Sequence, residues 1–295
     1  MLWKRDWGLT GRVWLTMFLL FVVYLVFLAI LGILGIPMNF LIVIAVVMAF
    51  IQYFFSDKLV LWTTGSRIVA EDEFPELHQM IEKLCREADL PKPKVAIMQS
   101  PVPNAFATGR SPKHAVVAVT DSIMRLLSRD ELEAVLAHEL SHVKNRDILT
   151  MTVASFIAMI ASIIMQNFLW GAMFGRRNSE GAGAWIIAGL VAMIVYFVAN
   201  LLIMALSRYR EFAADRGSGY ITRNPRALIS ALSKISGRMD AVPAEYKAKV
   251  EGANAFFIIP ALSGKNTLME LFSTHPALEK RIANLEQVEA ELRGQ

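Results

Sequence analysis

Long uncharged runs alternate with polar stretches along this chain. Residues 13–56, 148–175 and 181–207 contain no Asp, Glu, Lys or Arg. About 20 apolar residues cross a bilayer as a helix, so the first run is long enough for two spans and each of the others for one. Residues 35–37, which read Gly-Ile-Pro, divide the first run in two, so the chain has four apolar runs in all. The pattern therefore predicts two transmembrane hairpins, over residues 1–56 and 148–207.

The segments 57–147 and 208–295 carry shorter periodicities. Val116, Val117 and Val119 mark a strand, and apolar residues at helical spacing mark the helices. Together the two segments are long enough for one hydrophobic core, so we expect a single domain. The predicted elements are helix 75–88, strand 94–99, a turn near 101–103, an extended segment 104–109, strand 114–120, and helices near 129–145, 208–221, 225–236 and 277–292. The predicted fold class is α+β, rich in helix, with a small β-sheet beside four transmembrane helices.

Composition supports an integral membrane protein. Of 295 residues, 55% are hydrophobic and 19% are charged, and the mean hydropathy is +0.44, which is too apolar for an ordinary soluble domain. The net charge is +4 and the pI is about 9.2. Because the basic residues flank the apolar runs, we expect contact with anionic lipid and no nucleic-acid partner.

The flanking charges also predict an orientation. Lys4, Arg5 and Arg12 precede the first span, and the 35–38 connection is uncharged, so the positive-inside rule places the N-terminus and the domain in the cytoplasm. Arg176 and Arg177 lie in a connection that should face outward, which conflicts mildly with this rule. The second hairpin could instead be partly sheltered against the domain.

Three residues outside the later motifs have simpler interpretations. Cys85, the single cysteine, shares the apolar face of helix 75–88, which predicts a buried packing role and fits a reducing compartment. His78 is expected on the exposed face of the same helix. His114 lies beside a lysine at a strand start, and we expect solvated surface roles for both histidines.

Residues 138–142 read His-Glu-Leu-Ser-His and lie within the predicted helix 129–145, which opens on a capping-box pattern at Ser128 and Glu131. Two imidazoles four residues apart share one helical face and can bind one zinc ion, and Glu139 can take a proton from water at the metal. So short a pattern also arises by chance on a solvated helix face. A catalytic zinc needs a third protein ligand, which must come from elsewhere.

Glu211 and Asp215 follow the fourth apolar run and lie four residues apart on one helical face. Glu211 can complete a zinc site with His138 and His142. Asp215 can accept a hydrogen bond from the far ring nitrogen of a ligand histidine and fix its tautomer. The alternative is salt pairing within the helix, with Arg208 bound to Glu211.

Other motifs accompany these residues in a fixed order. They are Pro-Asn-Ala-Phe-Ala-Thr-Gly at 103–109, Ser-Arg-Tyr-Arg-Glu-Phe-Ala-Ala-Asp at 207–215, and Ser-Thr-His-Pro at 273–276, with Arg281 and Ile282 beyond. With the paired spans and the His-Glu-Leu-Ser-His helix, they make nearly the whole chain resemble the HtpX membrane zinc metalloproteases, relatives of the CAAX prenyl endopeptidases.

The resemblance implies a zincin-like, gluzincin domain in which His138, His142 and Glu211 bind Zn²⁺ and Glu139 is the catalytic carboxylate. It implies an endopeptidase of the bacterial inner membrane that degrades misfolded or damaged membrane proteins as quality control. The expected partners are polypeptide substrates, membrane proteins among them, and the lipid bilayer.

Two further groups are candidates for substrate contact. His275 precedes Pro276, which disfavours helix and predicts a ring that projects from a loop; with the resemblance, this makes it a candidate donor to the oxyanion. A structural loop histidine is the alternative. Residues 104–109 suit an edge strand that pairs with an extended substrate, which makes Asn104, Ala105 and Phe106 candidate binding residues. Asn104 could equally form a turn beside Pro103.

Competing functions remain open from sequence. An intramembrane protease would place its zinc helix inside the bilayer, which the charged residues 144, 146 and 147 disfavour. A CAAX-type processing protease is closer, although those relatives have more spans than four. A non-catalytic chaperone or scaffold would need neither an open metal position nor a general base.

Overall fold

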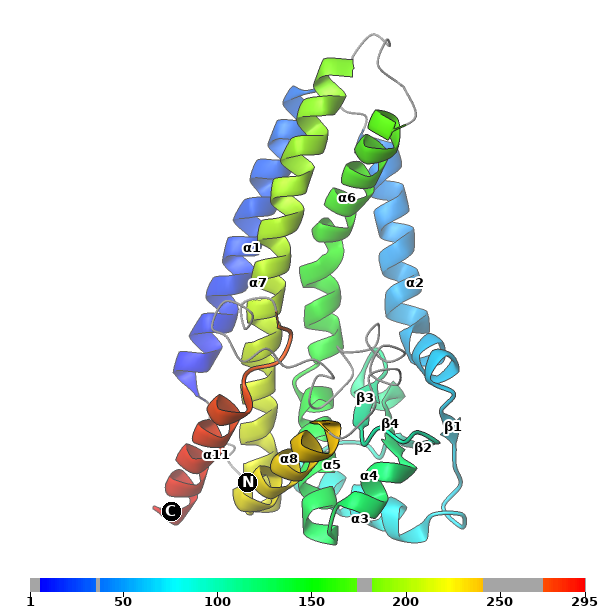
Figure 1. Ribbon diagram of the computed structural model, residues 1–295, viewed down its shortest axis with the longest axis vertical. Coiled ribbons are helices and arrows are strands. Elements are labelled where there is room, and N and C mark those ends of the chain that lie inside the picture. The colour runs from blue at the N-terminus through cyan, green and yellow to red at the C-terminus, as the bar shows by residue number, and fades with distance from the viewer. Residues whose placement is uncertain (1–5, 36–37, 174–181, 241–272, 295) are drawn as a thin grey trace. The chain divides into compact units, whose positions relative to one another are not determined.

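A computed structural model of the protein describes residues 6–35, 38–173, 182–240 and 273–294 (Figure 1). The chain divides into two compact units. A helical unit holds residues 6–53 and 150–206, and an α/β unit holds residues 54–149 with the described parts of 207–294. The predicted loop around Arg176 and Arg177 lies outside the described residues.

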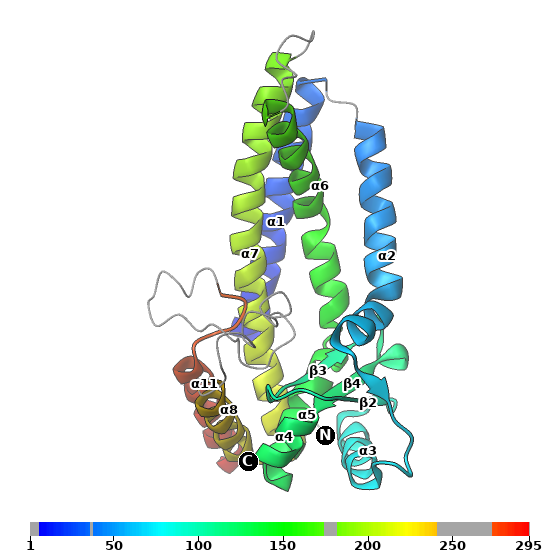
Figure 2. The same ribbon diagram turned by 45° about the vertical axis from the view of Figure 1, so that its right-hand side comes forward.

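The helical unit is built from long apolar helices. They are α1 (Trp7–Ile33) and parts of α2 (Met38–Thr64), α6 (Asp147–Met173) and α7 (Ala182–Thr222). Phe27 and Leu31 of α1 pack with Ile160 and Ile164 of α6, and α1, α6 and α7 lie side by side (Figures 1 and 2). The Tyr24 hydroxyl donates to the carbonyl of Ala154 at 2.5 Å. Such a bond satisfies a polar group that the apolar interior would otherwise leave unpaired.

Among the described residues, three helices are long and apolar enough to cross a membrane: Trp7–Ile33, Asp147–Asn167 and Ile186–Thr222. A fourth span counts only if Val46–Phe55 and Asp57–Thr64, which meet at a bend of 65°, are taken together. The second apolar run was expected to end at residue 56, whereas α2 continues to Thr64.

α7 differs from expectation because it does not stop at the end of the fourth apolar run. One helix of 41 residues, Ala182–Thr222, replaces the predicted span and the separate helix 208–221. No Gly or Pro occurs between residues 190 and 216, so nothing in the backbone interrupts the helix where polarity changes. The helix that is apolar at its start therefore also carries Glu211 and Asp215.

The α/β unit contains a four-stranded mixed sheet. Its strands are β1 (Arg67–Ile68), β2 (Lys94–Met98), β3 (Ala105–Thr108) and β4 (Val116–Thr120), in the order β1-β2-β4-β3. β2 and β4 are parallel, and the other pairs are antiparallel. The three predicted strands are present, slightly shortened, and residues 112–114 form a 3₁₀ turn in place of the start of the last one. β1 was not predicted, since two residues carry no periodicity.

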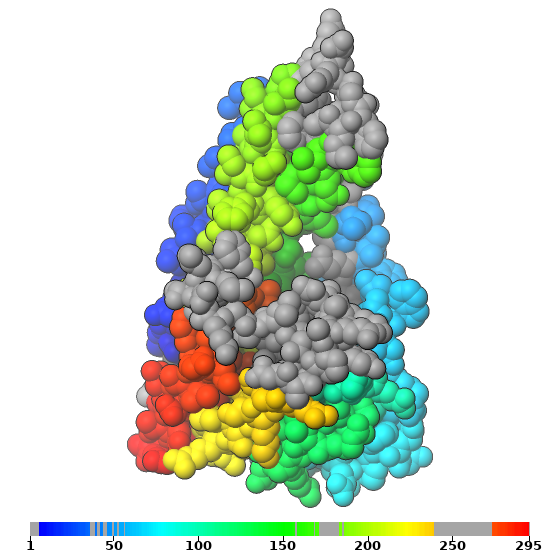
Figure 3. Space-filling view, viewed as in Figure 1, coloured from blue at the N-terminus to red at the C-terminus, as the bar shows by residue number. Residues whose placement is uncertain are grey.

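Five further helices of the described residues belong to the α/β unit. They are α3 (Pro75–Ala88), α4 (Asp121–Leu126), α5 (Arg129–Lys144), α8 (Pro225–Asp240) and α11 (Leu278–Arg293). α4 was not predicted, whereas the others lie within a few residues of expectation. α3 and α5 lie on one side of the sheet (Figure 2), and α11 runs beside α8 on the surface in Figure 3.

The two faces of the sheet follow the strand period of two. Val95, Ile97, Val117 and Val119 point toward α3, α5 and α8 in the main core, while Ala96, Met98, Phe106, Val116 and Ala118 pack against Val60 of α2. Cys85 is buried in the main core as predicted. His78 was expected to be exposed, but it is 7% exposed, because α3 turns it toward the interior.

Candidate metal centre and active site

α5 positions the first three site residues. Its capping box is complete: the Ser128 hydroxyl accepts from the Glu131 amide at 3.4 Å, and the Glu131 carboxylate accepts from the Ser128 amide at 2.8 Å. The helix runs on to Lys144 and buries His138 and Glu139. Because the cap fixes where the helix begins, it also fixes the direction in which each later side chain points. His138 and His142, four residues apart, therefore present their rings on one face.

α7 brings Glu211 to the two histidines. The Nε2 atoms of His138 and His142 lie 3.2 Å apart. Glu211 Oε2 lies 3.6 Å from His138 Nε2, and Glu211 Oε1 lies 3.4 Å from His142 Nε2. The three residues form the metal-compatible group in the described part of the chain, with ligand atoms all within 4.8 Å.

These distances fit a metal ion. A tetrahedral zinc ion about 2.0–2.1 Å from each donor holds the donors roughly 3.3 Å apart, close to the three separations above. Glu211 Oε2 has ion-pair contacts to His275 and Arg281 at 3.2 and 3.5 Å but no hydrogen bond, although a buried carboxylate oxygen normally accepts one. Two imidazole nitrogens and one carboxylate also match the ligand chemistry of zinc.

Asp215 contacts the ring nitrogen of His138 that faces away from the other two ligands. Its Oδ1 lies 3.0 Å from His138 Nδ1, so Nε2 is left for a metal ion. Burial lowers the pKa of His138, but the carboxylates of Asp215 and Glu211 outweigh burial and raise it. This direction favours the protonated ring in the metal-free protein, and metal binding competes with that proton.

Arg281 of α11 is a site residue whose role the sequence did not reveal. Its Nε donates to Asp215 Oδ2 at 2.9 Å and its Nη2 to Oδ1 at 2.6 Å, while Nη1 lies 3.5 Å from Glu211 Oε2. Arg281 is 2% exposed. A sequence signal existed, because Arg281 falls on the same helical face as the buried Leu285 and Val288. A charge at a core position of an amphipathic helix indicates a buried partner.

His142 has a comparable carboxylate partner that sequence reasoning missed. Asp147 Oδ2 lies 2.5 Å from His142 Nδ1, and Arg210 Nε lies 3.2 Å from Asp147 Oδ1. Burial lowers the pKa of His142, but Asp147 and Glu211 outweigh it and raise the pKa to about 10. From the sequence, Asp147 counts only among the charged residues that disfavour a zinc helix inside the bilayer.

Glu139 lies beside the edge of the sheet. Its Oε2 accepts a hydrogen bond from the backbone N–H of Ala107 at 2.9 Å. Burial raises the pKa of the Glu139 carboxyl. β3 is an edge strand of the sheet, and the Asn104 carbonyl accepts a hydrogen bond from the Thr120 amide of β4. In an antiparallel pair every second residue bonds to the neighbouring strand, so the backbone N–H and C=O groups of Ala105 and Ala107 point away from β4.

The candidate substrate residues of β3 are more buried than expected. Asn104 is buried, and its backbone N–H donates to Thr120 Oγ1 at 2.9 Å. Phe106 packs on the face of the sheet that Val60 covers, and Ala105 lies in the main core. The side chains of Ala105 and Phe106 are therefore parts of the two apolar clusters.

His275 lies in the loop before α11, but its ring does not project into solvent. The residue is buried, and Nδ1 lies 3.2 Å from Glu211 Oε2. Arg208 donates to the backbone carbonyl of Ser273 at 2.7 Å. His275 thus lies in a loop, as predicted, and its ring faces Glu211 of the ligand set.

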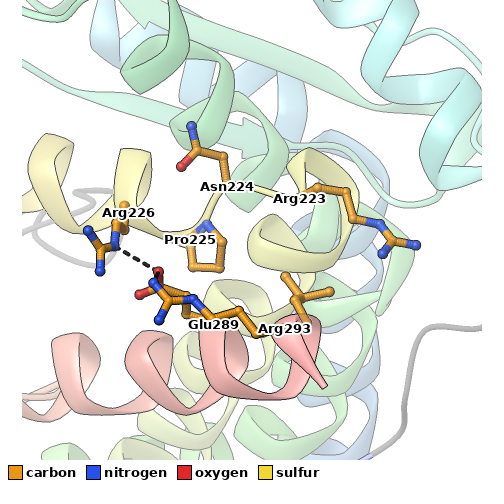
Figure 4. A pocket seen from close by; sticks show the side chains of 7 residues that line it. Arg223, Asn224, Pro225, Arg226, Glu289 and Arg293 are labelled. Carbon is orange, nitrogen blue, oxygen red and sulfur yellow. Dashed lines mark hydrogen bonds and ion pairs between the residues drawn. The ribbon is translucent and has the colours of Figure 1, made fainter. Parts of the chain in front are cut away.

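An open pocket of about 310 Å³ lies apart from these residues, at the turn between α7 and α8 beside α11 (Figure 4). Arg226 and Glu289 form an ion pair at its wall. The residues that line it include none of the metal-centre side chains. His114 is exposed, as predicted, and its Nδ1 lies 2.8 Å from Ser111 Oγ.

Comparison with known proteins points to one family. The profile of Peptidase family M48 matches residues 71–289, a range that contains every residue of the centre above. Protease HtpX homolog 2 of Methanosarcina acetivorans is 58% identical over 98% of both chains. The Protease HtpX homolog of Moorella thermoacetica is 53% identical over 97% of this chain and 96% of the relative.

A solved structure gives a likeness in fold. The crystal structure of S. mikatae Ste24p matches with a TM-score of 0.55 and covers 94% of this chain and 67% of the Ste24p chain. Sequence identity in that comparison is 18%, so the similarity concerns the arrangement of the backbone alone.

Proposed function

The chain belongs to peptidase family M48, and from that membership we propose that it is a zinc-dependent endopeptidase that cleaves misfolded or damaged membrane proteins. Membership confirms the predicted metalloprotease and the predicted resemblance to HtpX proteins. The observation that carries the proposal is the meeting of His138, His142 and Glu211 within 4.8 Å, with Glu139 adjacent.

Each residue has a proposed task. The Nε2 atoms of His138 and His142 and the carboxylate of Glu211 hold the metal, which when bound supplies a Lewis acid that polarises the scissile carbonyl. Glu139 takes the proton of the attacking water and delivers it to the leaving amine. Its raised pKa, caused by burial, suits a group that must accept and then return a proton near neutral pH.

Substrate binding is proposed at the edge of β3. The outward backbone groups of Ala105 and the outward carbonyl of Ala107 can pair with an extended peptide, while the Ala107 N–H already donates to Glu139. Such pairing selects for backbone and little for sequence. Asn104, at the start of the strand, is proposed to contact the substrate backbone. His275 is proposed to donate to the oxyanion through Nε2, which is buried without a hydrogen bond.

The proposed setting is the inner membrane, with the α/β unit in the cytoplasm. Support comes from the candidate spans and from the basic residues that precede the first of them. Unfolded segments of membrane proteins are the proposed substrates, since recognition through main chain needs exposed, extended polypeptide.

The test uses the full chain purified in detergent and loaded with zinc. Glu139→Gln should keep about one zinc per chain and lose casein hydrolysis, because the carboxylate serves water rather than the metal. Glu211→Ala should lose zinc, since two protein ligands are too few. Glu133→Gln on the same helix is the matched control and should keep both properties.

Three results would contradict the proposal. One is a parent protein that binds no stoichiometric zinc, and another is casein hydrolysis that survives in Glu139→Gln. The third concerns substrate class: cleavage of a prenylated CAAX peptide without cleavage of casein or unfolded membrane protein would favour a processing protease.

A further inference from the structure

We infer that Asp147 is a positioning residue for the metal ligand His142, and that Arg210 holds Asp147 in place. The inference rests on the proposed metal site and adds a requirement to it: the second histidine has its own orienting carboxylate, drawn from the first residue of α6.

The two ring nitrogens of His142 have different partners. Asp147 Oδ2 lies 2.5 Å from His142 Nδ1, so this nitrogen carries the hydrogen that the carboxylate accepts. Nε2 is then left with its lone pair, and it faces His138 Nε2 at 3.2 Å and Glu211 Oε1 at 3.4 Å. A carboxylate on the far nitrogen fixes the tautomer and makes the ligating nitrogen more basic.

Asp147 has a partner on each oxygen. While Oδ2 faces His142, Oδ1 lies 3.2 Å from Arg210 Nε. Asp147 is 4% exposed, whereas an acidic residue that merely begins a helix normally stays in water. Arg210 precedes Glu211, so the turn of α7 that supplies the third ligand also anchors Asp147.

The turn between α5 and α6 makes this contact possible. Asn145 ends α5, and Arg146 has a φ of 54°, in the left-handed region. Non-glycine residues rarely take this conformation, and here it separates α5 from α6. Asp147 then begins α6 with its carboxylate beside His142, five positions earlier.

Two parallel assemblies therefore serve the two histidines. One is His138–Asp215–Arg281, in which α11 provides the arginine. The other is His142–Asp147–Arg210, in which α6 provides the carboxylate and α7 the arginine. Metal retention then depends on the contact between the first residue of α6 and α7.

The experiment measures zinc affinity of the full chain in detergent by competition with a chelator. Asp147→Asn should keep the fold and weaken zinc binding about 10–100-fold, the range seen when a ligand histidine loses its carboxylate. Arg210→Gln should weaken binding less, because Asp147 keeps its bond to His142. In the double variant the effects should not add, since both act through one histidine.

Asp121→Asn is the matched control. Asp121 also begins a helix, accepts from the Ser100 amide at 2.9 Å and pairs with Arg125, but it does not contact the metal centre residues described above. Its zinc affinity should equal that of the parent. This comparison separates loss of a helix-start carboxylate from loss of the histidine partner.

An unchanged zinc affinity in Asp147→Asn overturns the inference. If that variant does not fold, Arg210→Gln decides: weaker binding supports the inference, and parental binding overturns it. A parent chain without stoichiometric zinc would overturn the proposed function itself. A parent that binds zinc while Asp215→Asn weakens binding and Asp147→Asn does not would remove only this inference.

Discussion

Arg281 donates two hydrogen bonds to Asp215, at 2.9 and 2.6 Å, and both residues are at most 2% exposed. Burial alone would lower the pKa of Arg281, but the charge of Asp215 outweighs it and raises the pKa. Removing one partner of such a pair leaves a buried charge uncompensated. The residue on which His138 depends is thus itself held by a helix that follows it in the chain.

Arg281→Met should lower the free energy of unfolding by about 3–5 kcal/mol and weaken zinc binding, because Asp215 loses the group that holds it against His138. Chemical unfolding in detergent and chelator competition would measure the two effects. Arg293→Met is the control, since Arg293 is an exposed partner of Glu289 and should cost at most about 1 kcal/mol. Equal losses in the two variants would contradict a special role for the buried pair.

His275→Ala should bind zinc and substrate normally and lower kcat on the order of 10²-fold, because only a hydrogen bond to the transition state is lost. Steady-state kinetics of the zinc-loaded variant would show this. If His275 only packs its loop, thermal stability should fall while kcat stays within about twofold of the parent.

The stability of the α5 start should depend on pH. Burial raises the pKa of Glu131, but hydrogen bonds from Lys234 and Ser230 outweigh it and lower the pKa from 4.5 to about 2. A folded-state pKa below the unfolded one gives stability that is present above pH 4.5 and is lost as the pH falls toward 2.

Glu131→Gln should therefore be less stable at neutral pH, on the order of 2–3 kcal/mol, and should lose less stability than the parent on acidification. Urea unfolding at several pH values would test this, with Glu133→Gln as the control. Parallel pH curves for the parent and Glu131→Gln would show that Glu131 is not the responsible group.

Two helical glycines should respond oppositely to alanine. A Cβ at Gly219 would lie 2.8 Å from Val288 of α11, whereas one at Gly237 would meet nothing within 4 Å. Gly219→Ala should lower stability by about 1–3 kcal/mol through overpacking. Gly237→Ala should raise it by roughly 0.5–1 kcal/mol, because alanine favours a helix. Thermal unfolding of both variants would reveal whether α11 sits as tightly on α7 as the structure indicates.

Features set by neighbouring residues could be predicted from the sequence, whereas features set by distant contacts could not. The capping box at Ser128 and Glu131 located α5 within a residue, because both partners lie within one turn. The end of the fourth apolar run was misread as a helix boundary, since polarity changes there while the backbone has no reason to stop. Hydropathy reports the surroundings of a helix rather than its ends.

The candidate site shows the same division. His138, His142, Glu211 and Asp215 stand at helical spacings that can be read directly from the chain. The partnership of Arg281 with Asp215 joins residues 66 apart, and no spacing rule connects them. Asp147 is near in sequence, but its contact with His142 forms across a left-handed residue, Arg146. A polar side chain after a helix does not predict that turn.

The order of the metal-centre residues along α5 and α7 has a consequence for biosynthesis. His138 and His142 are translated before the apolar residues 150–206 of the helical unit, and Glu211 comes after them. A nascent chain that stops before residue 211 holds at most two of the three proposed ligands, which is too few for a catalytic zinc site. A copy terminated at such a length is then inactive as a protease, and activity requires that the polypeptide for the second apolar hairpin has been made.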